Sequence, residues 1–187
     1  MKFLLFLAAL SAAISPAVAA DAHAGATKAQ ICIVCHKLAQ SYSFPLLDAQ
    51  PKEYLYTQMN AYKDKRRVWP GRPHNDTSLP ERDLRDIAEY FSAQKMPGVP
   101  FRIDPSKIAL GKETAEELKC ANCHMPDFSG KDDVPRLAGQ VPEYLVAQID
   151  ALSSGARTHG RATTVDPARN ANAQDSELLG HFFASLQ

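Results

Sequence analysis

Several residue types are scarce in this chain, and each scarcity argues against a class of function. The 187 residues carry 21 basic and 21 acidic side chains, so the formal net charge is zero and there is no basic excess for binding nucleic acid. After the first twenty residues no apolar run is long enough to cross a membrane, and no stretch alternates like a β-strand. Only four cysteines and four methionines are present. The scarce cysteines carry most of the functional information.

All four cysteines fall in two copies of one motif, C-x-x-C-H. The copies are Cys32-Ile33-Val34-Cys35-His36 and Cys120-Ala121-Asn122-Cys123-His124. This spacing is typical of covalent haem attachment: two thiols bond the porphyrin vinyl groups, and the adjacent imidazole ligates the iron. The motifs therefore predict two covalently bound haem c groups, held by Cys32, Cys35, His36, Cys120, Cys123 and His124.

Three other uses of paired cysteines remain as alternatives. A four-thiolate zinc site normally places its pairs closer together and requires no His after each pair. A thioredoxin-like redox pair occurs in a βαβ context that this sequence lacks. Structural disulfides suit an oxidising compartment but leave both histidines unexplained.

Residues 1–20 have the pattern of a secretory signal peptide. Lys2 precedes an apolar run from residue 3 to residue 10, and small residues follow at Ala17-Val18-Ala19-Ala20. Cleavage near Ala19 or Ala20 predicts a mature periplasmic protein without stable membrane insertion. The alternative is an uncleaved leader that acts as a membrane anchor.

The mature part of the chain repeats itself. Residues 44–67 align without a gap onto residues 134–157, including a shared Pro, Gln, Glu-Tyr-Leu and final Arg. A repeat that includes the haem motif predicts two similar domains, at 21–96 and 104–187, joined by a proline-containing linker at 97–103.

Helical periodicity recurs in both halves, and no strand pattern is found. Apolar residues at helical spacing predict helices at 27–36, 53–63, 80–94, 143–153 and 173–186. Asp104-Pro105 is a helix-start signal before the second motif. The basic run Lys63, Lys65, Arg66 and Arg67 is interpreted as a solvated helix end. The fold class expected from these patterns is all-α.

The two motifs and the repeated [FV]-P-x-L-x-x-Q-x-x-E-Y-L-x-x-Q segment resemble tandem dihaem cytochromes of the cytochrome c4 family. The resemblance covers essentially all of the mature sequence. It implies two class I cytochrome c domains in tandem, each wrapped around one covalent haem, that shuttle electrons in the periplasm. Periplasmic or membrane-bound redox proteins would be donor and acceptor. Pro45 and Pro135 would lie against the proximal histidines.

The chain departs from this family at the distal iron ligand. The family usually supplies a methionine from the loop before the closing helix, and neither loop here contains one. Met59 is interpreted as a core residue, Met96 lies in the linker region, and Met125 directly follows a proximal His. His74 and His159 lie in the loops, so we expect bis-histidine ligation by His36 with His74 and His124 with His159. His23 and His181 are reserve candidates.

The expected function is an electron carrier that is not an enzyme. Replacing a methionine ligand by histidine lowers the reduction potential, because imidazole favours ferric iron. The alternative follows if His159 does not reach the iron. An open second haem would then bind or convert peroxide, nitric oxide or a sulfur compound, with Arg161 available to stabilise an anion.

Overall fold

A computed structural model provides the structure of the chain and describes residues 19–36, 44–68, 74, 78–98, 101–158 and 167–186. Within these ranges the fold is all-α, as predicted, and the only β-type pairing is an isolated bridge between Lys131 and Val134. None of the described helices has both the length and the apolarity needed to cross a bilayer.

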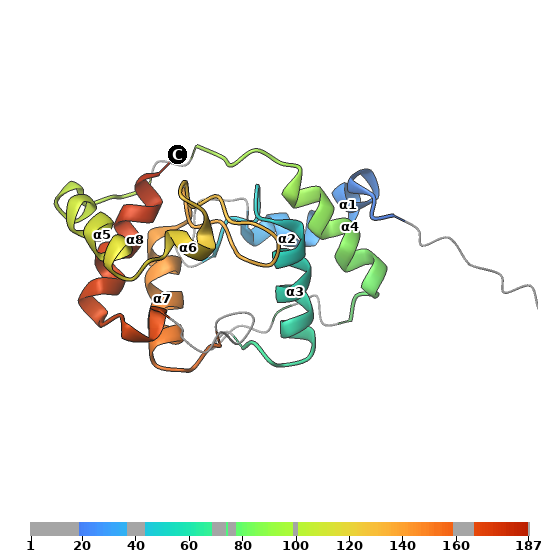
Figure 1. The fold of residues 1–187 in the computed structure, drawn as a ribbon. Coiled ribbons are helices and arrows are strands. Elements are labelled where there is room, and N and C mark those ends of the chain that lie inside the picture. The colour runs from blue at the N-terminus through green and yellow to red at the C-terminus, as the bar shows by residue number, and fades with distance from the viewer. Residues whose placement is uncertain are drawn as a thin grey trace, which may run out of the picture.

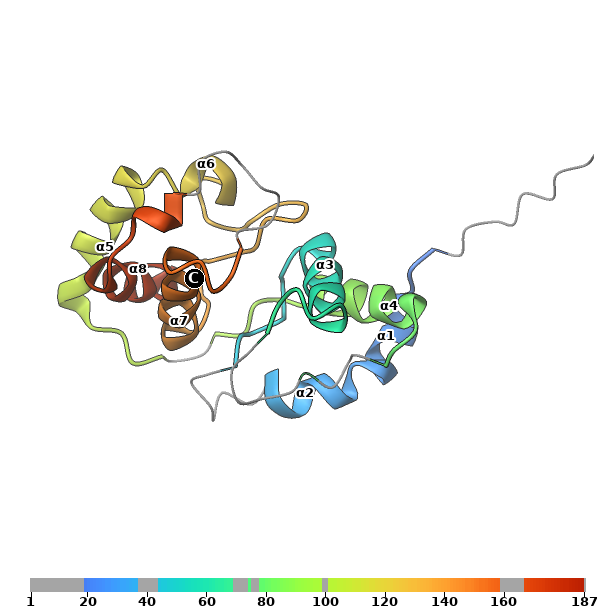
Figure 2. The ribbon, with the colours of Figure 1, turned by 90° about the horizontal axis from the view of Figure 1, so that it is seen from below.

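The helices form two halves that lie side by side (Figures 1 and 2). The first half contains α1 (Ala22–Lys28), α2 (Gln30–His36), α3 (Lys52–Lys63) and α4 (Glu81–Ser92). The second contains α5 (Pro105–Glu117), α6 (Ala121–His124), α7 (Pro142–Ser153), the 3-10 helix η1 (Pro167–Asn170) and α8 (Ala173–Ser185). This is the tandem arrangement of two similar helical halves that the repeat led us to expect.

The same helix pair closes each half, with α1 packed on α4 and α5 packed on α8. A glycine permits each close approach. A Cβ atom at Gly25 would lie 2.0 Å from the carbonyl oxygen of Asp86, and one at Gly111 would lie 2.2 Å from that of Leu178. Any larger residue at either position would force the two helices apart.

The first helix differs from the expectation. The stretch predicted as one helix at 27–36 is the end of α1 followed by α2, with Ala29 between them. The structure starts α1 earlier because the Asp21 side chain accepts hydrogen bonds from the amides of His23 and Ala24. The predicted cap at Asp104 is confirmed, since its carboxylate accepts from the Ser106 amide.

Each closing helix buries an apolar face against the core of its half. In α4 the predicted inward residues Leu84, Ile87, Ala88 and Phe91 are all buried. In α8, Leu179, Phe182 and Phe183 are buried, and Phe128 packs edge-on against Phe182 with ring centroids 5.7 Å apart. Complete burial of a side chain of this size contributes about 1.5–3 kcal/mol.

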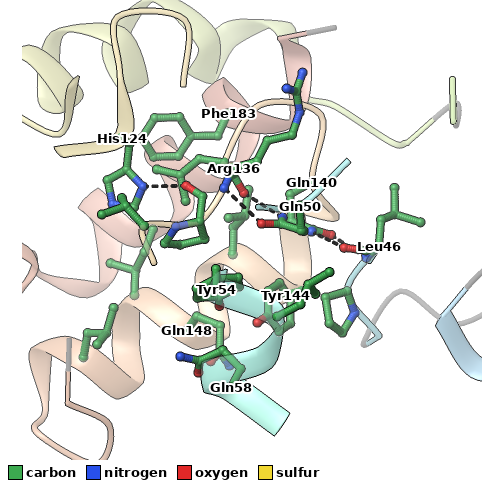
Figure 3. Close-up of a pocket in the computed structure, with 18 of the residues that line it drawn as sticks. Leu46, Gln50, Tyr54, Gln58, His124, Arg136, Gln140, Tyr144, Gln148 and Phe183 are labelled. Carbon is green, nitrogen blue, oxygen red and sulfur yellow. Dashed lines mark hydrogen bonds between the residues drawn. The ribbon is translucent and has the colours of Figure 1, made fainter. Parts of the chain in front are cut away.

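Two glutamines join the halves through matched hydrogen bonds. Gln140 donates to the Leu46 carbonyl at 2.8 Å and accepts from the Leu46 amide at 2.7 Å. Gln50 donates to the Arg136 carbonyl at 2.9 Å and accepts from the Arg136 amide at 3.0 Å (Figure 3). Gln50 and Gln140 coincide in the sequence repeat, as do Leu46 and Arg136, so each half holds the other by the same contact.

Candidate functional site

One cavity of about 1080 Å³ extends through both halves. This volume lies above the range of about 300–1,000 Å³ that is typical of a pocket for one drug-sized ligand. Both attachment motifs line it, with Cys32, Cys35 and His36 from the first half and Cys120, Cys123 and His124 from the second. The structure therefore brings all six predicted cofactor-binding residues to one connected space.

Each motif histidine is oriented by a backbone carbonyl. His36 Nδ1 lies 2.8 Å from the Pro45 oxygen, and His124 Nδ1 lies 2.8 Å from the Pro135 oxygen. A carbonyl can only accept, so Nδ1 carries the proton and the unprotonated Nε2 is the atom that would bind a metal. The positions expected for Pro45 and Pro135 are thereby confirmed.

None of the four cysteines forms a disulfide, so the disulfide alternative is not realised in this structure. Burial raises the pKa of Cys120 to about 11, which keeps this thiol protonated at neutral pH. Cys35 and Cys123 are exposed, whereas Cys32 and Cys120 are partly buried. Each pair thus has one sulfur at the rim of the cavity and one deeper inside.

His74 lies opposite the first motif histidine. Its ring centroid is 6.2 Å from that of His36, with 51° between the ring planes. It also stacks on Tyr62, with centroids 4.1 Å apart and the planes within 5° of parallel. His159, the proposed counterpart for the second motif, lies outside the described residues, as does Arg161.

The other candidate ligands are placed as follows. Met59 is partly buried, packs against the core of the first half and also lines the cavity. Met96 packs against the cluster of Leu46, Val141 and Tyr144, and Met125 is 37% exposed.

The two reserve histidines do not line the cavity. His23 is exposed. His181 is half-buried, and its Nδ1 accepts from the Asp104 amide at 3.2 Å.

A polar network between α3 and α7 forms the centre of the interface. The Arg67 guanidinium donates to Gln58 at 2.8 Å and, across the interface, to Tyr144 at 2.9 Å and Gln148 at 2.8 Å. Arg157 makes the equivalent contacts in the opposite direction. It donates to Gln148 at 2.6 Å and, across the interface, to Tyr54 and Gln58, both at 3.2 Å.

The same glutamines and tyrosines lie close together in Figure 3. Burial tends to raise the pKa of Tyr54, but the positive charges of Arg157 and Arg67 outweigh it and lower this pKa to about 8. The phenol is thus held in a strongly electropositive position.

This network corrects one interpretation and adds residues that the sequence argument missed. Arg67 is 9% exposed, so the basic run is not solvated throughout, although Lys65 and Arg66 are exposed. The signal that could have identified the network was in the repeat, where the Tyr, Gln and Arg of both copies coincide.

The residues present fit haem c. Paired thiols would supply the covalent attachment, and the motif imidazoles would supply iron ligands. The hydrogen bonds of Arg67 within the described residues go only to neutral groups. A buried cation of this kind favours a nearby anion, and haem carries two carboxylates. Tyr54, Leu55, Phe91 and Phe183 supply apolar and aromatic walls.

Comparison with known proteins points to one family. The sequence model of the Cytochrome c family matches residues 108–182. Cytochrome c4 of Pseudomonas aeruginosa is 34% identical over 159 residues, which cover 79% of this chain and 78% of that protein. The thiosulfate dehydrogenase electron acceptor of Thiomonas intermedia is 28% identical over 171 residues, covering 84% and 78% respectively.

The fold agrees with a solved structure. Reduced recombinant cytochrome c4 from Pseudomonas stutzeri superimposes with a TM-score of 0.76 at 29% identity. The match covers 90% of this chain and 100% of that one. It therefore includes both halves and the cavity between them.

Proposed function

The chain belongs to the cytochrome c4 family, and from this premise we propose that it is a periplasmic dihaem electron carrier whose haems have two histidine ligands each and a lowered reduction potential. Bound haem supplies a one-electron couple between ferric and ferrous iron. The residues of the chain attach it, orient the axial imidazoles and exclude water from the cavity.

The separation of His36 and His74 carries the ligand proposal for the first haem. A metal bonds imidazole nitrogen at about 2 Å, and each ring centre lies about 1 Å behind its nitrogen. Two imidazoles on one iron therefore have ring centres about 6 Å apart. The observed 6.2 Å matches this spacing, and the Nδ1 bond of His36 sets the tautomer in which Nε2 is unprotonated.

Optical spectra of the purified holoprotein test this proposal. We expect His74→Ala to convert one haem to high spin and to let the reduced form bind carbon monoxide. Met59→Leu is the matched control, because Met59 lines the same cavity. We expect this control to keep the low-spin spectrum and to lack the near-infrared band of methionine ligation. A low-spin His74→Ala protein, or a high-spin Met59→Leu protein, would refute the assignment.

The second haem allows a rival function. Among the described residues that line the cavity in the second half, His124 is the one histidine and no methionine is present. If His159 does not ligate, this haem is open and can bind or convert peroxide, nitric oxide or a sulfur compound. Carbon monoxide binding to the unmodified reduced protein would favour this alternative. Its absence, with high spin appearing in His159→Ala, would favour the carrier.

The partners are proposed to be periplasmic or membrane-bound redox proteins. The relative named as a thiosulfate dehydrogenase electron acceptor supports a role as the acceptor of a single dehydrogenase. Reduction of the purified holoprotein by candidate dehydrogenases, followed at the haem absorption bands, distinguishes a dedicated acceptor from a general carrier. A dedicated acceptor is reduced fast by one enzyme and slowly by the others.

A further inference from the structure

His74 is contacted by a planar side chain that has no counterpart in the second half. Tyr62 stacks on it face to face, with centroids 4.1 Å apart and only 5° between the planes. The residue that aligns with Tyr62 in the repeat is Leu152, a buried aliphatic side chain. An aliphatic group cannot fix the rotation of a ring by stacking. The two distal sides therefore differ in how a ligand ring can be held.

Tyr62 is itself held by Arg67. The guanidinium carbon of Arg67 lies 4.8 Å from the centroid of the Tyr62 ring, a cation–π distance. Burial raises the pKa of Tyr62 to about 12, so the phenol stays neutral at physiological pH and keeps an electron-rich ring face. His74, Tyr62 and Arg67 thus form one stack of planar groups.

The far end of this stack is fixed by the other half of the molecule. Arg67 donates to Tyr144 at 2.9 Å and to Gln148 at 2.8 Å, and both partners belong to α7. Arg67 is buried, and hydrogen bonds from a charged donor are stronger than those between neutral groups. Such a support is rigid compared with a loop side chain in water.

We propose that Tyr62 is a positioning residue that fixes the imidazole plane of His74 on the first haem, and that the second domain holds Tyr62 in place through Arg67. This inference rests on the proposed ligation by His74. The first haem would then respond to the docking of the two domains. The second haem would lack such a support, because Leu152 stands at the position equivalent to Tyr62. The two haems are therefore expected to have different spectroscopic signatures and potentials.

Electron paramagnetic resonance of the ferric holoprotein tests the proposal, because the g-values of a low-spin bis-imidazole haem depend on the angle between the two rings. His74→Ala first identifies the signal of the first haem by its loss. Tyr62→Leu copies the residue found at the equivalent position of the second half. We expect it to shift or broaden the signal of the first haem, and to change the reduction potential of the first haem but not that of the second. Tyr62→Phe keeps the stacked ring and should restore the signal of the unmodified protein.

The contribution of the second domain is tested by Tyr144→Phe, which removes one acceptor of Arg67 and leaves a ring of similar size. A smaller shift of the first signal is expected, with the second signal unchanged. If Tyr62→Leu leaves the first signal unchanged, the positioning role is wrong even when His74→Ala shows that His74 ligates. If Tyr144→Phe has no effect on that signal, the second domain does not take part. Low spin in His74→Ala would instead refute the ligation itself.

Discussion

At the scale of single residues, one buried charge dominates the interface. Arg67 is surrounded by Gln58, Tyr144 and Gln148, which are neutral, and by the ring of Tyr62. A planar guanidinium can donate several hydrogen bonds and stack on an aromatic ring at the same time, which the ammonium group of lysine cannot do. The side chain of its neighbour Arg66 is 60% exposed and forms a surface ion pair with Asp64, so adjacent arginines have very different roles.

We predict that Arg67→Met lowers the free energy of unfolding by about 2–3 kcal/mol, because the buried Tyr144 hydroxyl loses the hydrogen bond from Arg67 and Gln58 and Gln148 each lose one of two charged donors. Arg66→Met is the matched control and should change it by less than about 0.5 kcal/mol, since exposed ion pairs contribute little. Guanidinium unfolding of both holoproteins, followed by far-ultraviolet circular dichroism, measures the difference. Equal effects would mean that burial of Arg67 is energetically unimportant.

At the scale of helices, a glycine at the crossing point determines how closely each closing pair packs. Gly111 lies against the backbone of α8 so closely that an added Cβ would be 2.2 Å from the Leu178 oxygen and 2.7 Å from the Cβ atom of Phe182. The first of these contacts is with backbone, which cannot move aside by changing rotamer. The helix pair itself must separate.

Gly111→Ala is therefore expected to destabilise the second half by about 1–3 kcal/mol or more, through overpacking. Gly98→Ala serves as the control, because a Cβ atom there meets nothing within 4 Å. Thermal unfolding of the two holoproteins gives the comparison. A melting temperature that falls equally in both variants would contradict the close-packing argument.

At the scale of the whole molecule, the reciprocal glutamines make the two halves one unit. Gln140 is 1% exposed and Gln50 is 3% exposed, and each satisfies the backbone of the opposite half. Undocking would break these hydrogen bonds. Both amides would then need water as a partner, because a buried amide without a hydrogen bond is costly. The shared cavity depends on this docking because both halves line it.

The double variant Gln50→Leu with Gln140→Leu should loosen the docking while each half keeps its own helices. We expect unfolding to change from one cooperative transition to two, and the radius of gyration measured by small-angle X-ray scattering to increase. Gln94→Leu is the control, since the Gln94 side chain donates to the Tyr90 carbonyl of its own half. A single transition with an unchanged radius in the double variant would show that other contacts hold the halves together.

The sequence by itself determined the helical class and the two similar halves, and it predicted the six attachment residues that the structure brings to one cavity. These depend on short-range patterns: the C-x-x-C-H spacing, the helical period and a gapless repeat. It also predicted His74 as a ligand from its place in the loop, and the structure puts the His74 ring 6.2 Å from that of His36. Only the tertiary structure decided that Arg67 is buried, that one cavity serves both halves and that Tyr62 stacks on His74. Each of these depends on contacts between separate segments of the chain. The charge and spacing of residues along the chain do not show which groups become buried when the halves dock.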